Sequence, residues 1–450
     1  MALITGGLPG LVWSVVWAHV GQLMIVLSLA EMSSLVPVAG GPYQWVSAFA
    51  PQPYQQLLSY LTGSLCSIGW QARFTVICYL LAGIMLALVE TNHDDFHSTK
   101  WQRNLLTIAV ASVVSAFNAL AAAHLSIAEG VFALCHVYAL VPIVVSLWLL
   151  ASKGSVADVF LNFTDNGGNW PSSALGVLVG QLPAMFTVLG SEATAHIAEE
   201  VEEPNKILPR CMVWSYLANL PGTLILLLTF AFNISDLNSA MNDMIPFGSV
   251  LRTALNSREA NTGFLTVILS LMFMVAVSTM VSTSRHLFSF ARDRALYSSP
   301  WFSKVDTTLQ VPLNAIYSTL ILTIVLVLVT IWNRSPLNTM MGLTVAALMS
   351  AYIVAIGSFL KKRLSGEGLP QAGWSLGNAG IWINGFAILY ATWSLFWSFW
   401  PVKYRPSARD MNWAILLYLT VVSYGLGFFI SSQRRLRLRP MEMIPTWARR

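Results

Sequence analysis

Apolar stretches of about 20 residues recur along almost the whole chain, and this spacing constrains the fold more than any other feature. Such a stretch spans a bilayer as a helix, because lipid offers no hydrogen-bond partners to an unpaired backbone. The composition agrees, since 56% of the residues are hydrophobic and 10% are charged, whereas a soluble domain carries about 25% charged residues. We therefore expect an all-α integral membrane protein that forms a single polytopic domain over residues 1–450.

The apolar runs predict about eleven transmembrane helices. Two of them are longer than a bilayer requires, so we expect tilt, breaks or extensions beyond the membrane. No linker indicates a second domain. The predicted spans are 10–33, 55–89, 103–123, 126–151, 173–197, 210–233, 263–291, 312–332, 338–361, 379–400 and 411–431.

Several classes of function find no support in the sequence. The chain has no HExxH, GxSxG or phosphate-binding loop, so we predict that it is not an enzyme and uses no cofactor. The net charge of +5 gathers in short loops and in the tail at 432–450, which indicates a cytoplasmic membrane face and not nucleic-acid binding. The isolated cysteines predict neither disulfides nor a metal site; they are Cys66, Cys78, Cys135 and Cys211.

Basic residues predict the orientation in the membrane. A cytoplasmic C-terminus places SRHLFSFARDRAL at 284–296, KKRLSGEG at 361–368 and the tail at 432–450 inside, as the positive-inside rule requires. With an odd number of spans, this orientation puts the N-terminus outside. It also puts VKYRPSAR at 402–409 outside, and the three basic residues of that segment count against this orientation.

Glycosylation sequons corroborate this orientation. Asn162, Asn233 and Asn333 each begin an Asn-X-Ser/Thr sequence, and all three fall in loops that this orientation places outside. They predict a glycoprotein that passes through the secretory route, most simply to the plasma membrane.

The stretch FTVLGSEATAHIAEEVEEPNK at 186–206 carries charge into an apolar run. A charged residue such as Glu192 costs about 2.5–3.5 kcal/mol at the centre of a spanning helix, so it should face a cavity or a partner. Gly190 and Pro183 both weaken the helix here and favour a break of the kind that binds substrates in transporters. The alternative is that Glu192 and His196, four residues apart, pair on one helix face.

Three further stretches carry polar residues into or beside predicted spans. The middle of residues 31–51 holds two prolines, Pro37 and Pro42, and a Gly-Gly pair. This predicts a re-entrant or interfacial segment with Tyr43 and Trp45 at the interface; an ordinary cytoplasmic loop is the alternative. Serines and threonines at 277–296 could coordinate an ion or satisfy backbone carbonyls. Arg73 must find a carboxylate or reach water. His19 and His136 are by default hydrogen-bonded packing residues, and a proton carrier is the alternative for either.

Four motifs together resemble the fungal amino acid and choline permeases of the amino acid–polyamine–organocation superfamily, which includes yeast-type GABA and choline transporters. They are PVAGGPYQWVSAFAP at 37–51, GWQ at 69–71, SEATAHIAEEVEEPNKILPR at 191–210 and SRHLFSFARDRAL at 284–296. The resemblance implies two inverted five-helix repeats (5+5) plus two extra helices, with substrate held between broken first and sixth helices.

The span 173–197 resembles that sixth helix, and this assigns roles to its residues. Phe186 would be an aromatic gate, Leu189 and Gly190 the unwound backbone, and Glu192 the acidic position beyond it. Glu192 and His196 are the candidates for coupling. The full substrate-binding set that the resemblance implies is Phe186, Thr187, Leu189, Gly190, Ser191, Glu192, Gly69, Trp70, Ser278, Thr279 and Ser282.

The chain departs from the family pattern in two ways. Arg73 stands where we expect a small residue, and it could pair with Glu192. The family also has twelve helices and a cytoplasmic N-terminus, whereas the resemblance here begins after the first helix. The missing helix would carry the glycine-rich break that binds a substrate carboxylate.

The sequence therefore predicts a secondary active transporter of amino acids or related amines, such as GABA or choline-like solutes, that works by alternating access. Proton coupling through Glu192 and His196 is one mechanism, and exchange would look the same in sequence. The alternative is a truncated, non-transporting membrane protein, either a nutrient sensor or an inert product. The expected partners are a small-molecule substrate and the lipid bilayer.

Overall fold

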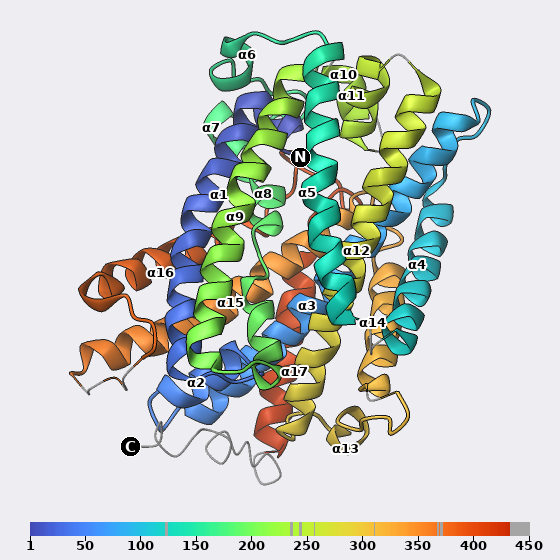
Figure 1. Cartoon of the computed structure of the whole chain (residues 1–450). Coiled ribbons are helices and arrows are strands. Elements are labelled where there is room, and N and C mark those ends of the chain that lie inside the picture. The colour runs from blue at the N-terminus through green and yellow to red at the C-terminus, as the bar shows by residue number, and fades with distance from the viewer. Residues whose placement is uncertain are drawn as a thin grey trace.

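A computed structural model describes residues 1–450 except 122–124, 235–236, 243–244, 256, 310, 367–368, 370–371 and 433–450. Within these residues the chain is helical without a strand, and the long helices stand side by side as a bundle (Figure 1). The predicted basic tail at 432–450 lies outside the described residues, apart from Ser432 at the end of the last helix.

Ten helical segments of the described chain are long and apolar enough to cross a membrane, and α14, Leu313–Val329, is a shorter apolar helix. The all-α membrane fold is thus confirmed. One of the ten is the segment Ser173–Glu200, which contains α7, α8 and η2. The other nine are α1 (Ala2–Leu35), α3 (Gln55–Asn92), α4 (Lys100–Leu120), α5 (Leu125–Leu150), α9 (Pro204–Asn233), α12 (Arg258–Arg292), α15 (Pro336–Leu364), α16 (Gly380–Trp397) and α17 (Ala414–Ser432).

Short helices in the connections were not predicted, because they hold too few residues to show a helical period. In Figure 1, α6, α10 and α11 lie at the end of the bundle where α1 begins, and α2 and α13 lie at the opposite end. The short elements are α2 (Pro42–Phe49), α6 (Val156–Phe160), α10 (Leu237–Asn242), α11 (Pro246–Leu255), α13 (Ser299–Phe302) and η3 (Gly377–Ala379).

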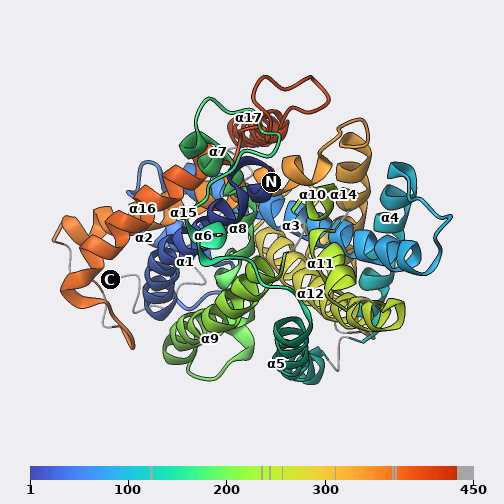
Figure 2. The same cartoon turned by 90° about the horizontal axis from the view of Figure 1, so that it is seen from above.

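The helices divide into inner and outer ones. In the most apolar stretch of α15, 78% of the residues are buried, and in that of α3 the buried share is 72%. The buried shares for α5 and α9 are only 11% and 6%. Viewed along the bundle, α5 and α9 lie at the periphery (Figure 2). Their exposed faces carry apolar side chains such as Tyr138 on α5 and Trp214 on α9, as expected of helices that contact lipid.

The segment 31–51 is interrupted as its prolines and glycines predict, but its aromatic rings are not at an interface. Helix α1 ends at Leu35, and α2 packs on α3 and α15. Tyr43 and Trp45 are 1% and 0% exposed. The prediction of interfacial rings is wrong because both polar atoms find partners inside the protein: the Tyr43 hydroxyl donates to Asp293 and the Trp45 indole N–H to the Val36 carbonyl.

The acidic cluster that ends FTVLGSEATAHIAEEVEE contacts the basic end of α12. Glu199 pairs with Arg292, and Glu200 pairs with Arg285 at 3.1 Å. At this same end of the bundle, Arg363 at the end of α15 pairs with Glu31 near the end of α1. The basic segments therefore gather where α12, α15 and α17 end (Figure 1), and the cytoplasmic side of this end stays a prediction.

The three sequons differ in accessibility. Asn162 is exposed in the connection after α6. Asn233 and Asn333 are each 2% exposed, and their amides donate to Thr229 O and Thr339 Oγ1. A glycan on either buried asparagine does not fit this fold, so Asn162 remains the candidate.

Candidate functional site

The predicted break is present in the segment Ser173–Glu200. Helix α7, Ser173–Gly180, is followed by α8, Leu182–Thr187, with Pro183 in the first turn of α8. After Thr187 the backbone passes through Gly190 at φ 106°, a left-handed conformation that favours glycine. A 3₁₀ helix, η2, Ser191–Glu200, then continues to the far end. The backbone between α8 and η2 is thus not α-helical.

Glu192 and His196 do not pair with each other. The predicted pairing assumed an α-helix, but η2 turns once every three residues, so side chains four apart point in different directions. His196 Nδ1 instead donates to the Ala39 carbonyl at 2.8 Å. Glu192 is 0% exposed, and neither carboxylate oxygen has a hydrogen-bond partner among the described residues.

Arg73 lies beside the break. Its Nη1 donates to the Phe186 carbonyl at 3.2 Å, and its guanidinium carbon lies 5.2 Å from the Phe186 ring and 5.9 Å from the Trp70 ring. It interacts electrostatically with Glu192 without an ion-pair contact, and the Tyr352 hydroxyl also faces that carboxylate. The sequence predicted a carboxylate or water as partner, whereas the arginine uses a carbonyl group of the broken helix and two aromatic faces.

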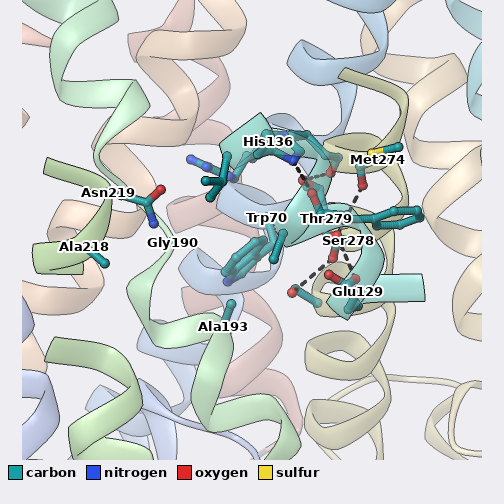
Figure 3. Close-up of a pocket in the computed structure, with 16 residues that line it drawn as sticks. Trp70, Glu129, His136, Gly190, Ala193, Ala218, Asn219, Met274, Ser278 and Thr279 are labelled. Atoms are coloured by element: carbon teal, nitrogen blue, oxygen red, sulfur yellow. Dashed lines mark hydrogen bonds between the residues drawn. The ribbon is translucent and has the colours of Figure 1, made fainter. Parts of the chain in front are cut away.

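A cavity of about 520 Å³ opens between α3, α5, the break, α9 and α12 (Figure 3). Of the residues predicted to bind substrate, five border it: Trp70, Gly190, Ser278, Thr279 and Ser282. Arg73 borders it as well. The structure thus brings together parts of three predicted segments that lie far apart in the sequence.

The other predicted residues lie behind or away from this cavity. Phe186, Leu189 and Glu192 are buried, and Ser191 is partly buried. Gly69 faces α15, where an added Cβ would lie 2.8 Å from Leu348. The last of these residues is Thr187, which is exposed and donates its hydroxyl to the Ala184 carbonyl.

The hydroxyl groups of α12 mostly satisfy backbone carbonyls. Thr279 donates to the Val275 carbonyl at 2.7 Å, and Ser282 donates to the Ser278 carbonyl at 3.3 Å. Ser278 also donates to Glu129 Oε1 on α5 at 2.7 Å, which joins the two helices across the cavity wall (Figure 3). Among the described residues, no group of three or more His, Cys, Asp or Glu side chains could hold a metal ion.

Glu129 and Asn219 are cavity residues that sequence reasoning missed. Glu129 is an acidic residue inside the predicted span 126–151, so the argument used for Glu192 would have found it. Asn219 points into the space from α9 (Figure 3) and had no distinguishing motif. The cavity thus holds one cationic and one anionic side chain, Arg73 and Glu129, together with the Trp70 indole.

Comparison with known proteins covers nearly the whole chain. The family described as Amino acid permease matches residues 1–421. Amino-acid permease 2 of Neurospora crassa is 24% identical over 452 residues, which is 98% of this chain and 82% of that protein. Amino-acid permease BAT1 of Arabidopsis thaliana is 24% identical over 456 residues, 98% of this chain and 88% of that protein. The similarity includes the broken helix and every wall of the cavity.

Proposed function

This chain belongs to the amino acid permease family, and on that premise we propose that it is a secondary active transporter of amino acids or related amines. It is a multi-pass integral membrane protein and not an enzyme. The observation that carries the proposal is the cavity of about 520 Å³ beside a broken helix, bordered by both Arg73 and Glu129.

The two charges suit a substrate that carries both an amino group and a carboxylate. A guanidinium binds a carboxylate through charge-assisted hydrogen bonds, and a carboxylate accepts hydrogen bonds from an ammonium group. Arg73 uses Nη1 for the Phe186 carbonyl and has further N–H groups for a ligand. A choline-like solute has no carboxylate to offer Arg73, so amino acids, including ω-amino acids such as GABA, fit the cavity better.

Alternating access is the mechanism that we propose. Broken helices in transporters allow one half of a helix to move while the other stays packed. Here α7 packs against α1, whereas η2 contacts α9, α12 and α1 at the other end of the bundle. Movement of η2 about Gly190 would open the cavity toward the end where α12 finishes. We propose a plasma-membrane location with that end cytoplasmic, and proton coupling that involves Glu192 and His196.

Uptake in a permease-deficient yeast strain tests this function. Cells that express the full chain should accumulate labelled amino acids from a mixture, with labelled GABA and choline measured separately. Replacing Glu192 by Gln keeps the size of the side chain and removes its charge, and we expect uptake to fall at least about tenfold, a typical loss for an essential interaction. The control is Glu203→Gln, which alters an exposed carboxylate in the connection between η2 and α9.

Two outcomes would contradict the proposal at different points. If the protein reaches the plasma membrane and no labelled solute accumulates or exchanges, the non-transporting alternative is favoured. If uptake is unchanged in the Glu192→Gln variant, the role that we propose for Glu192 is wrong, but the proposed transport function is not contradicted.

A further inference from the structure

Two buried histidines from distant parts of the sequence lie in contact inside the bundle. His196 belongs to η2 and His286 to α12. Their ring centroids are 5.2 Å apart, and the residues are 5% and 0% exposed. The sequence singled out only His196, and the resemblance gives His286 no role.

The hydrogen bonds of these rings fix where their protons are. His196 Nδ1 bonds to the Ala39 carbonyl at 2.8 Å, and His286 Nε2 bonds to the Gly63 carbonyl at 3.3 Å. A carbonyl oxygen only accepts, so each of these nitrogens must carry a hydrogen. In the neutral rings the other two nitrogens, His196 Nε2 and His286 Nδ1, are therefore acceptors.

Both of these acceptor nitrogens are buried, and neither has a hydrogen-bond partner among the described residues. Leaving a buried polar atom unpaired costs about 1–3 kcal/mol. One added proton would satisfy both at once, because the ring that carries it donates to the free nitrogen of the other. The two rings meet edge to face, with an interplanar angle of 65°.

The surrounding groups restrict where such a proton can come from. Trp70, whose ring lies 5.8 Å from that of His196, borders the substrate cavity. His196 also borders a second cavity of about 420 Å³, which includes Glu199, Glu200 and Arg285. His196 thus lies between Trp70 of the substrate cavity and a second cavity at the end where α12 finishes.

Charged neighbours come from two elements and a polar ring from a third. Helix α12 contributes Arg285, which interacts electrostatically with His196 and is partly neutralised by Glu200 of η2. The ring of Tyr43 on α2 lies 5.9 Å from that of His286, and its hydroxyl donates to Asp293.

Arg292 of α12 completes the charged surroundings, and it is paired with Glu199 of η2. Because both arginines have acidic partners, their positive charges are partly neutralised and repel a protonated histidine less strongly.

We propose that His196 and His286 form a proton-binding site that holds one proton between their free ring nitrogens and couples proton movement to transport. This rests on the proposed transport function. The proton comes from a hydronium ion in one cavity, and an N–H bond forms as an O–H bond breaks. On release to water in the other cavity, that N–H bond breaks and the hydronium ion re-forms.

The coupling follows from the elements that the proton joins. A shared proton links η2, the moving half of the broken helix, to α12, which forms the cavity wall at Ser278. Proton binding therefore favours the arrangement in which these elements touch. By linkage, a substrate that favours the same arrangement raises the proton affinity of the pair by the same factor.

Proteoliposomes of the purified full chain test the proposal. Uptake of a labelled amino acid mixture is measured with an imposed acidic exterior, and exchange is measured at equal pH on both sides. We expect His196→Gln and His286→Gln each to lose the stimulation by the pH gradient at least about tenfold, within the usual range of coupling between sites. Exchange at equal pH should remain measurable, because neither histidine borders the substrate cavity.

His19→Gln is the matched control. His19 is also buried and also bonds a backbone carbonyl, that of Val15 at 2.8 Å, but its ring contacts Tyr216 and no other histidine ring among the described residues. This variant should keep the gradient stimulation. Gradient-driven uptake that persists in both His196 and His286 variants would overturn the proton site. Failure of the unmodified chain to exchange any solute would instead contradict the transport function.

A spectroscopic measurement on the unmodified chain needs no variant to fold. With ¹⁵N-labelled histidine, a proton shared between two imidazoles produces a coupling between their nitrogens. We expect this coupling to appear as the pH is lowered. Its absence at every pH at which the protein stays folded would refute the shared proton, whatever the transport assay shows.

Discussion

At the scale of single residues, Gly190 determines where the broken helix changes direction. Its φ of 106° is a conformation that side chains with a Cβ rarely adopt. Space is not the limiting factor, because an added Cβ would meet Arg73 at 3.5 Å, an ordinary contact. The backbone conformation itself therefore requires glycine here.

We expect Gly190→Ala to destabilise the protein by about 1–3 kcal/mol, the cost of holding a residue in a strained conformation. The purified variant should unfold at a lower temperature and transport more slowly. Gly263→Ala is the control, because Gly263 lies inside α12 with open space around it, and alanine there should be neutral or stabilising by up to about 1 kcal/mol. Equal melting temperatures for Gly190→Ala and the unmodified chain would show that the left-handed conformation is not required.

Arg73 tests the choice between amino acids and choline-like amines. Arg73→Gln would remove the charge-assisted hydrogen bond that we propose between Arg73 and a substrate carboxylate, and such a bond is worth about 1.5–3 kcal/mol. We expect uptake of amino acids to fall by about tenfold or more, and uptake of a carboxylate-free amine to be unaffected or improved. Competition between the two solutes measures this change in selectivity.

Arg103→Gln is the control for loss of a cation from the bundle. Arg103 lies over the Tyr79 ring at 4.1 Å and does not border the substrate cavity. It should alter stability without altering the ratio between the two solutes. If Arg73→Gln lowers the uptake of both solutes equally, Arg73 shapes the cavity and does not bind the carboxylate.

At the scale of elements, the ends of α1 and α15 are joined by a buried ion pair. Glu31 Oε2 lies 2.6 Å from Arg363, and their side chains are 1% and 10% exposed. Glu31 Oε1 accepts further hydrogen bonds from the Ser375 hydroxyl and the Leu376 N–H. The pair thus fixes the connection after α15 onto α1.

We expect Glu31→Gln to destabilise the protein by about 3–5 kcal/mol, because it leaves a buried arginine without its counter-charge. The measurement is the midpoint of thermal unfolding of the purified protein. Glu203→Gln breaks an exposed pair with Lys206 and should change stability by no more than about 1 kcal/mol. Arg363→Gln added to Glu31→Gln should recover part of the loss; no recovery would show that the ion pair is not the cause.

At the scale of the whole molecule, the connections divide between two ends of the bundle. The loops that hold Asn162 and residues 402–409 contact each other at the end where α1 begins, since the Tyr404 N–H donates to the Gly168 carbonyl. The basic segments 284–296 and 361–363 lie at the other end (Figure 1). One modification at a known end would therefore orient every helix.

Expression in yeast followed by glycosidase treatment provides that test. We expect a mobility shift that Asn162→Gln abolishes, because Asn162 is the exposed sequon. Asn233→Gln and Asn333→Gln should leave the shift unchanged, since both residues are buried. A shift that survives in the Asn162→Gln variant, or a chain without any glycan, would contradict this use of the sequons.

The sequence by itself determined the spans, the membrane class and the break at Gly190. Lipid forbids unpaired backbone groups, so each apolar run must be a helix, and glycine and proline act on the backbone of their own segment. Most predicted spans therefore match a helix to within a few residues. The helices α1, α9 and α12 begin earlier than predicted, and the span 173–197 is divided into α7, α8 and η2.

Only the tertiary structure decided which polar groups meet. The carbonyl partner of Arg73, the burial of Tyr43 and Trp45, the contact of Glu129 with Ser278 and that of His196 with His286 all join residues from different helices. Helix period states which face a side chain occupies but not what packs against it. The 3₁₀ geometry of η2 shows the same limit, because it separated Glu192 from His196 where an α-helix would have aligned them.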